Sequence, residues 1–216
     1  MRRVGRCFAL AAIVAATAVT PAAAAAAAGV DLRAAAAAAT PDPAHGKILY
    51  LKRCAACHRA HGWGDGPREI PALAAQQRPY LIAQLALFAS GERAGSLMHG
   101  PAMHETLLQP DLNRPQAFAD LAAYLASARS NPEPEHSEGR ALAAGRSTYT
   151  LACSSCHGSA GAGSETVPAI GGQHYSYLLA QLRAFARGGR RGHPAFPALS
   201  DEQQQAVADY VSRLRP

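Results

Sequence analysis

The sequence predicts an all-α protein built from two tandem modules. The first observation is an internal repeat, because a pattern that begins at Gly46 returns at Gly145. The second is that apolar residues recur at helical spacing, whereas no stretch alternates as a strand does. The third is a polar stretch punctuated by prolines, residues 130–137, which is typical of a linker. We therefore expect one domain over residues 44–129 and another over residues 138–216.

Composition narrows the class of protein. Hydrophobic residues make up 49% of the 216 residues but aromatic residues only 6%, and the alanine-rich residues 11–39 inflate the apolar share. Each module has fewer than about 100 residues, a size at which apolar burial alone stabilises weakly and a covalent or metal staple helps. Beyond the N-terminus, no apolar run approaches the about 20 residues of a membrane helix. A collagen-like, polytopic membrane or wholly disordered protein is therefore excluded.

The N-terminus resembles an export signal. Arg2, Arg3 and Arg6 precede an apolar stretch over residues 7–19, and small residues that suit cleavage follow. We expect residues 1–28 to be a signal peptide that directs the protein to the periplasm. An uncleaved N-terminus is the alternative, and it would keep the protein near the membrane. Cleavage would remove the three arginines and lower the formal charge from +6 to +3. So small a net charge does not indicate a nucleic-acid-binding protein.

After an alanine-rich linker over residues 29–43, each module is expected to contain three helices. Apolar spacing and helix-start residues such as Ser200 define them. The predicted helices span residues 44–57, 78–90 and 115–128 in the first module and residues 137–156, 175–187 and 200–214 in the second.

The repeat is not uniform along the module. The offset between equivalent residues is 99 at the first motif and 97 at the Tyr-Leu-x-Ala-Gln-Leu motif, which starts at Tyr80 and Tyr177. It falls to 86 at the last helix, where Tyr124 matches Tyr210. The second module therefore lacks eleven residues in the loop before its last helix.

Each module carries one Cys-x-x-Cys-His motif, which is typical of c-type haem attachment. Two thiols at this spacing reach the two vinyl groups of one porphyrin, and the following histidine reaches the iron as its proximal ligand. Zinc would require a second ligand pair in each module, and thioredoxin chemistry would require a βαβ unit. The predicted thioether residues are Cys54, Cys57, Cys153 and Cys156, and the predicted proximal ligands are His58 and His157.

These motifs, together with the helix that contains Tyr177 and the preceding Gly-Gly-Gln-His at residues 171–174, resemble the di-haem cytochrome c4 family over residues 44–216. The resemblance implies two tandem class I cytochrome c domains in a pseudo-two-fold arrangement, with two covalently bound haem c groups. It also implies electron transfer to a terminal oxidase or reductase, with haem propionates near the domain interface.

In that family a methionine binds the distal face of each iron. Met98 is the expected ligand in the first module, with Met103 as the alternative. The second module contains no methionine, so His/Met ligation of its haem is excluded. His193 is the leading candidate there, ahead of an iron left open beside Phe196. Ligation by His174 is a further alternative, although hydrogen bonding near a propionate suits that residue better.

The expected function is that of a periplasmic electron carrier, in which no side chain performs proton chemistry. A haem enzyme or a gas- or peroxide-binding protein that acts at an open second iron is the alternative, with Glu165 or Asp201 as unplaced acid groups. A cytochrome subunit of a dehydrogenase or oxidase complex is a third possibility.

Two other features have more than one interpretation. Trp63 either packs on the first haem or lies at the domain interface. The arginines near the second distal loop form either a solvated rim or a surface that binds propionates or an acidic partner. These arginines are Arg183, Arg187, Arg190 and Arg191.

Overall fold

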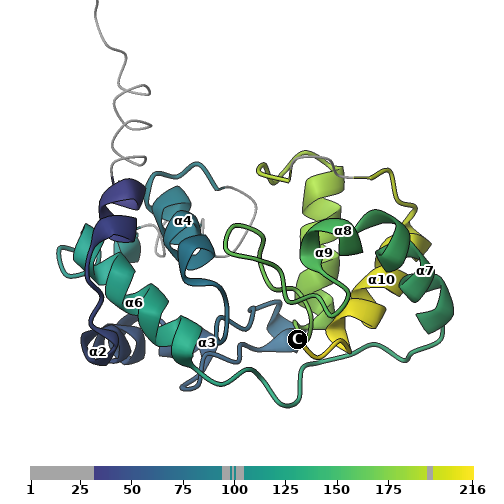
Figure 1. The fold of residues 1–216 in the computed structure, drawn as a ribbon, viewed down its shortest axis with the longest axis horizontal. Coiled ribbons are helices and arrows are strands. Elements are labelled where there is room, and N and C mark those ends of the chain that lie inside the picture. Colours follow the sequence, from purple (N-terminus) through teal and green to yellow (C-terminus); the bar gives the residue numbers. More distant parts are fainter. Residues whose placement is uncertain (1–31, 94–97, 99, 101–104, 194–196) are drawn as a thin grey trace, which may run out of the picture.

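A computed structural model describes residues 32–93, 98, 100, 105–193 and 197–216. Within these residues the chain is helical and contains no β-sheet, only one isolated bridge between Asp65 and Ile70. Figure 1 shows two helical modules side by side, with the linker passing from one to the other along their lower edge. No helix among the described residues is long and apolar enough to span a bilayer.

Among the described residues, the helices that build the first module include α-helices and one short 3-10 helix. In chain order they are α2 (Pro43–Arg53), α3 (Ala55–His58), η1 (Gly66–Arg68), α4 (Arg78–Ala89) and α6 (Pro115–Ser127). The helix predicted over residues 44–57 is thus two helices, because α2 ends at Arg53 and the chain turns at Cys54 before α3 begins.

The second module repeats this order. Its helices are α7 (Leu142–Ala152), α8 (Ser154–His157), α9 (Tyr175–Ala186) and α10 (Asp201–Ser212). The predicted helix over residues 137–156 begins five residues late, because Gly139 has a φ of 75°, which a helix does not allow. The backbone N–H groups of Ser137 and Gly139 instead donate to Asp209 on α10.

In each module the first and last long helices cross at a glycine. A Cβ atom on Gly46 of α2 would lie 2.1 Å from the backbone oxygen of Asp120 on α6. A Cβ atom on Gly145 of α7 would lie 2.1 Å from the backbone oxygen of Ala206 on α10. Only glycine permits such close approach of two helix backbones. The repeated glycine therefore fixes the same crossing in both modules.

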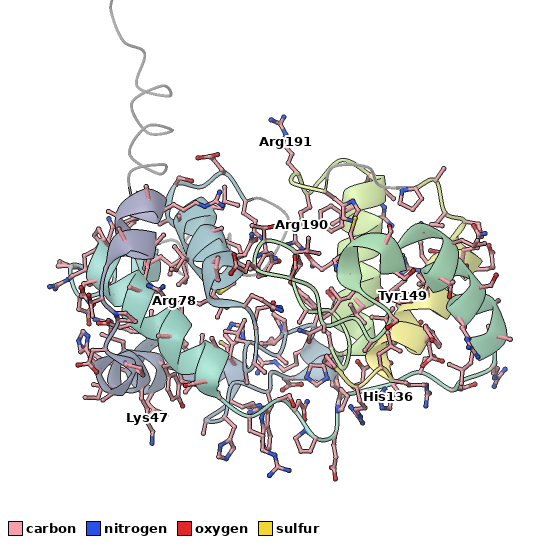
Figure 2. The ribbon with its side chains drawn as sticks, in the orientation of Figure 1. Lys47, Arg78, His136, Tyr149, Arg190 and Arg191 are labelled. Atoms are coloured by element: carbon pink, nitrogen blue, oxygen red, sulfur yellow. The ribbon has the colours of Figure 1, made fainter. Side chains whose placement is uncertain are left out.

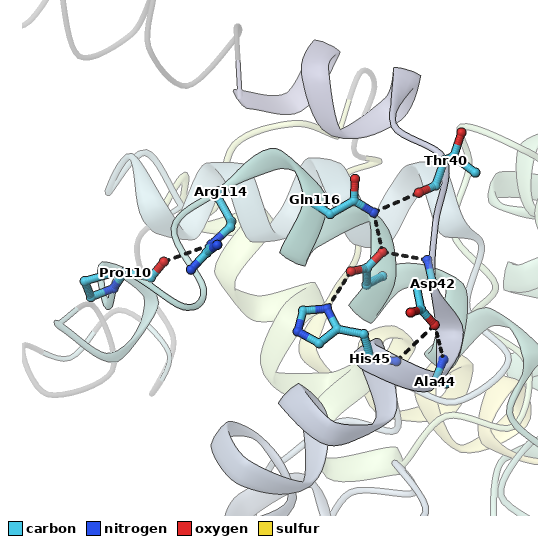
Figure 3. A network of polar contacts seen from close by, with 8 residues as sticks. Thr40, Asp42, Ala44, His45, Pro110, Arg114 and Gln116 are labelled. Atoms are coloured by element: carbon cyan, nitrogen blue, oxygen red, sulfur yellow. Dashed lines mark hydrogen bonds and ion pairs between the residues drawn. The ribbon is translucent and has the colours of Figure 1, made fainter.

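A buried aspartate ties the start of each module to its last helix. Asp120 accepts hydrogen bonds from the Asp42 N–H, the His45 Nδ1 and the Gln116 Nε2, each at 2.7 Å (Figure 3). Burial raises the pKa of Asp120, but these hydrogen bonds outweigh burial and hold the pKa below its usual value. The Asp120 carboxylate thus anchors the N-terminus of α2.

The segment predicted as an alanine-rich linker is partly ordered. Residues 32–38 are helical, and the side chain of Ala36 is fully buried against the first module. The Arg78 guanidinium donates to the carbonyl oxygens of Ala36 and Ala39, at 3.4 and 3.2 Å. A cation at the end of a helix stabilises its unpaired carbonyl groups. This helix is thereby fastened to the start of α4.

The described part of the hydrophobic core differs between the modules. In the first module it includes Phe118, Ile82 and Leu121, which are almost fully buried, and Met98 packs at its edge. In the second module the buried cluster is smaller; its members are Tyr149, Leu178, Leu179, Val207, Ala208 and Val211. The second module therefore depends more on any prosthetic group that completes its core.

The two modules contact each other through a pair of equivalent glutamines. The Gln76 side chain exchanges two hydrogen bonds of 2.9 Å with the backbone of Ala169 in the second module. The Gln173 side chain does the same, at the same distances, with the backbone of Ala72 in the first module. Both pairs are offset by 97 residues. The contact between the modules is therefore pseudo-two-fold.

The linker also fastens the modules. Glu135 accepts hydrogen bonds from the N–H and the hydroxyl of Ser176, at 2.9 and 2.6 Å, and so caps the N-terminus of α9. Its own N–H donates to Nδ1 of His174, whose Nε2 donates to the Trp63 carbonyl oxygen at 2.7 Å. His174 thus joins the linker, the second module and the first.

Candidate functional site

The two Cys-x-x-Cys-His motifs adopt the same turn. The N–H of Cys54 donates to the Tyr50 oxygen at 2.8 Å, and the N–H of His58 returns to the Cys54 oxygen at 2.9 Å. The equivalent bonds at Cys153 and His157 are 2.9 and 3.0 Å long. Each motif therefore forms one short helix, α3 or α8, directly after the long first helix. This turn carries both thiols and the imidazole on one compact element.

The two motif histidines share one orientation. Nδ1 of His58 lies 3.0 Å from the Pro71 oxygen, and Nδ1 of His157 lies 3.0 Å from the Pro168 oxygen. A carbonyl oxygen only accepts, so Nδ1 carries the proton and Nε2 is left as the atom that can bind a metal. Burial lowers the pKa of both histidines, which favours the neutral form that ligation needs.

The four motif thiols are free rather than joined in disulfides. Burial raises the pKa of Cys54 to about 12 and also raises that of Cys153, so both are protonated thiols. No three His, Cys, Asp or Glu side chains among the described residues come together to hold a metal ion. Two free thiols beside one imidazole with an available Nε2 suit haem c.

Met98 is the predicted distal ligand in the first module. The structure gives it a half-buried position against the first core. Its alternative, Met103, lies outside the described residues, as do the neighbouring His99 and His104. Met98 thus lies at the edge of the first module's apolar core.

In the second module the predicted distal ligand faces the motif histidine. The rings of His157 and His193 have centroids 6.4 Å apart and planes inclined by 27°. The edge of the His193 ring also contacts Phe185 of α9, with centroids 5.1 Å apart at 60°. Phe196, which was predicted to lie beside an open iron, falls outside the described residues.

Electrostatics around His193 favour its neutral form. Burial lowers its pKa most, and the nearby His157 and Arg190 lower it further. A neutral imidazole retains a lone pair for a metal. The pair His157–His193 therefore has the protonation state that iron ligation requires.

The arginines near this loop have different roles. Arg183 pairs with Asp201 at 2.8 Å, and both side chains are exposed enough to form a solvated rim. Arg191 extends away from the molecule, whereas Arg190 lies at the boundary between the modules (Figure 2). Glu165 is exposed. Both acid groups, Glu165 and Asp201, thus occupy exposed positions.

Trp63 lies at the contact between the modules. Its Nε1 donates to the Arg129 oxygen at 2.9 Å, and its ring lies 4.7 Å from that of His61. Its carbonyl oxygen accepts from His174, as described above. His174 is thus a bridging residue, and both of its ring nitrogens are occupied by backbone groups. This arrangement speaks against the alternative in which His174 binds iron.

The sequence interpretation missed the residues that join the modules. Gln76, Gln173 and Arg93 make contacts across the boundary but were assigned no role. The available signal was the offset of 97 residues, which relates Gln76 to Gln173 and Arg93 to Arg190. Repeated polar residues on equivalent surfaces indicate a pseudo-symmetric contact.

Two family models match the chain. One is described as "Cytochrome c" and matches residues 43–129. The other is described as "Cytochrome C oxidase, cbb3-type, subunit III" and matches residues 140–211. Each match covers one of the two modules.

Curated relatives and solved structures match across both modules. A cytochrome c4 from Thiocapsa roseopersicina is 33% identical, over 80% of this chain and 93% of that protein. A thiosulfate dehydrogenase electron acceptor from Thiomonas intermedia (strain K12) is also 33% identical, over 74% of this chain and 77% of that protein. The crystal structure of reduced recombinant cytochrome c4 from Pseudomonas stutzeri superposes with a TM-score of 0.69 at 26% identity, covering 82% of this chain and all of that one.

Proposed function

The chain belongs to the cytochrome c4 family of di-haem electron-transfer cytochromes, and from that membership we propose that it carries electrons between two redox proteins in the periplasm. It contains two covalently bound haem c groups, one for each module. Haem c, when bound, supplies a reversible one-electron ferric/ferrous couple. The role of this chain's own residues is to hold, space and tune two such centres.

Four cysteines and two histidines hold the groups. In the first module Cys54 and Cys57 form the thioether bonds and His58 is the proximal ligand. The second module uses Cys153, Cys156 and His157 in the same way. The Nδ1 hydrogen bonds to the carbonyls of Pro71 and Pro168 support this assignment, because they fix the tautomer and aim Nε2 away from the backbone.

The two modules differ in their distal ligands. Met98 is the distal ligand in the first module and His193 in the second. The observation that carries the second assignment is the 6.4 Å between the His157 and His193 ring centroids. A metal–imidazole bond of about 2.1 Å on each side, with each nitrogen about 1.1 Å from its ring centroid, gives about the same separation. The two rings thus have the spacing of ligands on opposite faces of one iron.

Unequal ligation gives unequal reduction potentials. A thioether ligand raises the potential of a haem relative to a second imidazole. The first centre is therefore the stronger oxidant and the second the stronger reductant. With these ligands in place each iron would be six-coordinate, which would leave no open position for substrates. This arrangement suits an electron carrier rather than a gas-binding protein or a peroxidase.

The donor class follows from the relatives. The protein from Thiomonas intermedia is described as an electron acceptor of thiosulfate dehydrogenase. Its similarity to this chain supports a dehydrogenase of this class as the electron donor. A terminal oxidase or reductase then receives the electrons. The signal-like residues 1–28 support an exported protein. Export also agrees with covalent haem attachment, because this attachment takes place outside the cytoplasm in bacteria.

Absorption and electron paramagnetic resonance spectra of the purified holoprotein test the distal ligands. We expect two low-spin haems that bind no carbon monoxide. His193→Ala should convert one haem to a high-spin form that binds one carbon monoxide per chain, and the exposed His61 provides the control variant His61→Ala, which should behave as wild type. A wild-type protein that binds carbon monoxide at one iron would instead support the open site of a haem enzyme or gas-binding protein.

A further inference from the structure

Two equivalent arginines cross the boundary between the modules. Arg93 donates to the Tyr177 hydroxyl at 3.1 Å, and Arg190 donates to the Tyr80 hydroxyl at 2.9 Å. Each guanidinium also binds a glutamine of its own module, at 2.6 and 2.5 Å, and lies 4.4 or 4.7 Å from the ring centroid of a phenylalanine. These glutamines and phenylalanines are Gln84 and Phe88 in the first module and Gln181 and Phe185 in the second.

We call each arginine with its tyrosine, glutamine and phenylalanine a clamp. All four members of one clamp are related to those of the other by 97 residues. Both arginines and both tyrosines are half-buried. A charge-assisted hydrogen bond with limited access to water is stronger than one at an open surface. The clamps therefore have the strength to fix side-chain positions across the boundary.

The clamp that contains Arg190 continues to the distal side of the second haem site. The Arg190 guanidinium lies over the ring of Phe185. The Phe185 ring also contacts the ring of His193, and the centroids of these two rings are 5.1 Å apart. His193 in turn faces His157. A continuous chain of contacts thus runs from Tyr80 of the first module through Arg190 and Phe185 to His193.

Two glycines of the loop that carries His193 lie in open surroundings. Positions Gly188 and Gly192 have positive φ values, and a Cβ atom at either would find no atom within 4 Å. Between them, the N–H of Arg190 donates to the Ala184 oxygen at 3.1 Å, and its guanidinium makes the clamp contacts. Arg190 therefore anchors the loop between these two open glycine positions. Fixing such a loop lowers the entropy that His193 would lose on ligation.

We propose that Arg190 and Phe185 are positioning residues for the distal ligand of the second haem, and that Tyr80 couples their placement to the docking of the first module. The proposal rests on the proposed ligation by His193. The contact between modules then has a second role besides spacing the haems, because it keeps the second iron six-coordinate. Separation of the modules would release His193 and open that iron.

The pseudo-symmetry supplies a matched control. Tyr80→Phe and Tyr177→Phe each remove one hydroxyl from an equivalent clamp, but only Tyr80 leads to His193 through Arg190. Arg190→Gln is a second variant of the same path. Haem content and the fraction of folded protein are measured first for every variant, so that a loss of folding is separated from a change of ligation.

The readout is the fraction of the second haem that is high-spin and binds carbon monoxide. Loss of one hydrogen bond should raise this fraction about fivefold to tenfold in Tyr80→Phe. Arg190→Gln should raise it at least as much, and Tyr177→Phe should leave it at the wild-type value. Equal fractions in the two tyrosine variants, or no change in Tyr80→Phe, would overturn the proposal while wild-type His/His ligation still stood. An open second iron in the wild type would overturn the proposed ligation as well.

Discussion

Replacing Gly46 with alanine should destabilise the first module by forcing α2 and α6 apart. The new Cβ atom would lie 2.1 Å from the backbone oxygen of Asp120 and 2.5 Å from its carbonyl carbon. Non-bonded carbon atoms pack best about 3.5–4 Å apart, so the helices must separate by at least about 1 Å at their crossing. The obstacle is backbone on a buried helix rather than the flexible end of a side chain. Little local relaxation is therefore available.

The size of the effect follows from this overlap. Overpacking of a well-packed interior costs about 1–3 kcal/mol. In a module of fewer than 100 residues each kcal/mol lowers the melting temperature by about 4–8 °C, so we expect a loss of at least about 4 °C. Gly145→Ala should have a similar effect in the second module, because its Cβ would also lie 2.1 Å from a backbone oxygen.

Thermal unfolding of the holoprotein, followed by far-ultraviolet circular dichroism, measures this loss. Gly189→Ala is the control, because its Cβ would lie 3.6 Å from the Ala184 oxygen, an ordinary contact distance. Its melting temperature should stay within about 1 °C of wild type. If Gly46→Ala has the same melting temperature as this control, the close crossing of α2 and α6 does not restrict the size of the side chain at position 46.

Three further outcomes follow from the site and its supports. Met98→Ala should abolish the thioether-to-iron charge-transfer band in the far-red spectrum of the oxidised protein, whereas Met103→Ala should retain it; the reverse result would make Met103 the ligand. Asp120→Asn should lower the free energy of unfolding in urea at pH 7 by about 1.5–3 kcal/mol. The pKa of Asp120 is lower in the folded protein than in the unfolded chain. The contribution of Asp120 to stability is therefore complete above about pH 4 and is lost as the pH falls through the folded pKa. On acidification the Asp120→Asn variant should accordingly lose less stability than wild type. Glu135→Ala should cost about 0.5–2 kcal/mol in the same urea assay by uncapping α9, and the exposed Glu133→Ala should cost nothing measurable.

Local pattern was sufficient for most of the fold. The all-α class and the tandem cytochrome c domains are confirmed. Helices α4 and α9 begin at Arg78 and Tyr175, as the apolar spacing predicts, and end one residue early. The pattern failed where a turn interrupts continuous periodicity. At Cys54 the chain bends between two helices, and at Gly139 a positive φ delays the start of α7.

The residues of the candidate site were also predictable from the sequence only in part. The Cys-x-x-Cys-His residues could be proposed from sequence because they are adjacent along the chain and act as one unit. The role of Arg190 could not, because its partner Tyr80 lies 110 residues away in the other module. In sequence alone Arg190 looks like its neighbours Arg187 and Arg191, which are exposed. Only the folded structure distinguishes Arg190, which is half-buried and contacts Tyr80, from the exposed arginines beside it.

The exchange of backbone hydrogen bonds by Gln76 and Gln173 has the form of an isologous contact, in which one patch meets its own copy. Such a contact is the one that two identical subunits make around a two-fold axis. A duplicated gene that encoded both halves would keep this pairing while raising the effective concentration of each half for the other. It would also free each half to vary alone, because a substitution in a fused pair alters one contact rather than two. The proposed difference in distal ligands, Met98 in one half and His193 in the other, would make use of that freedom.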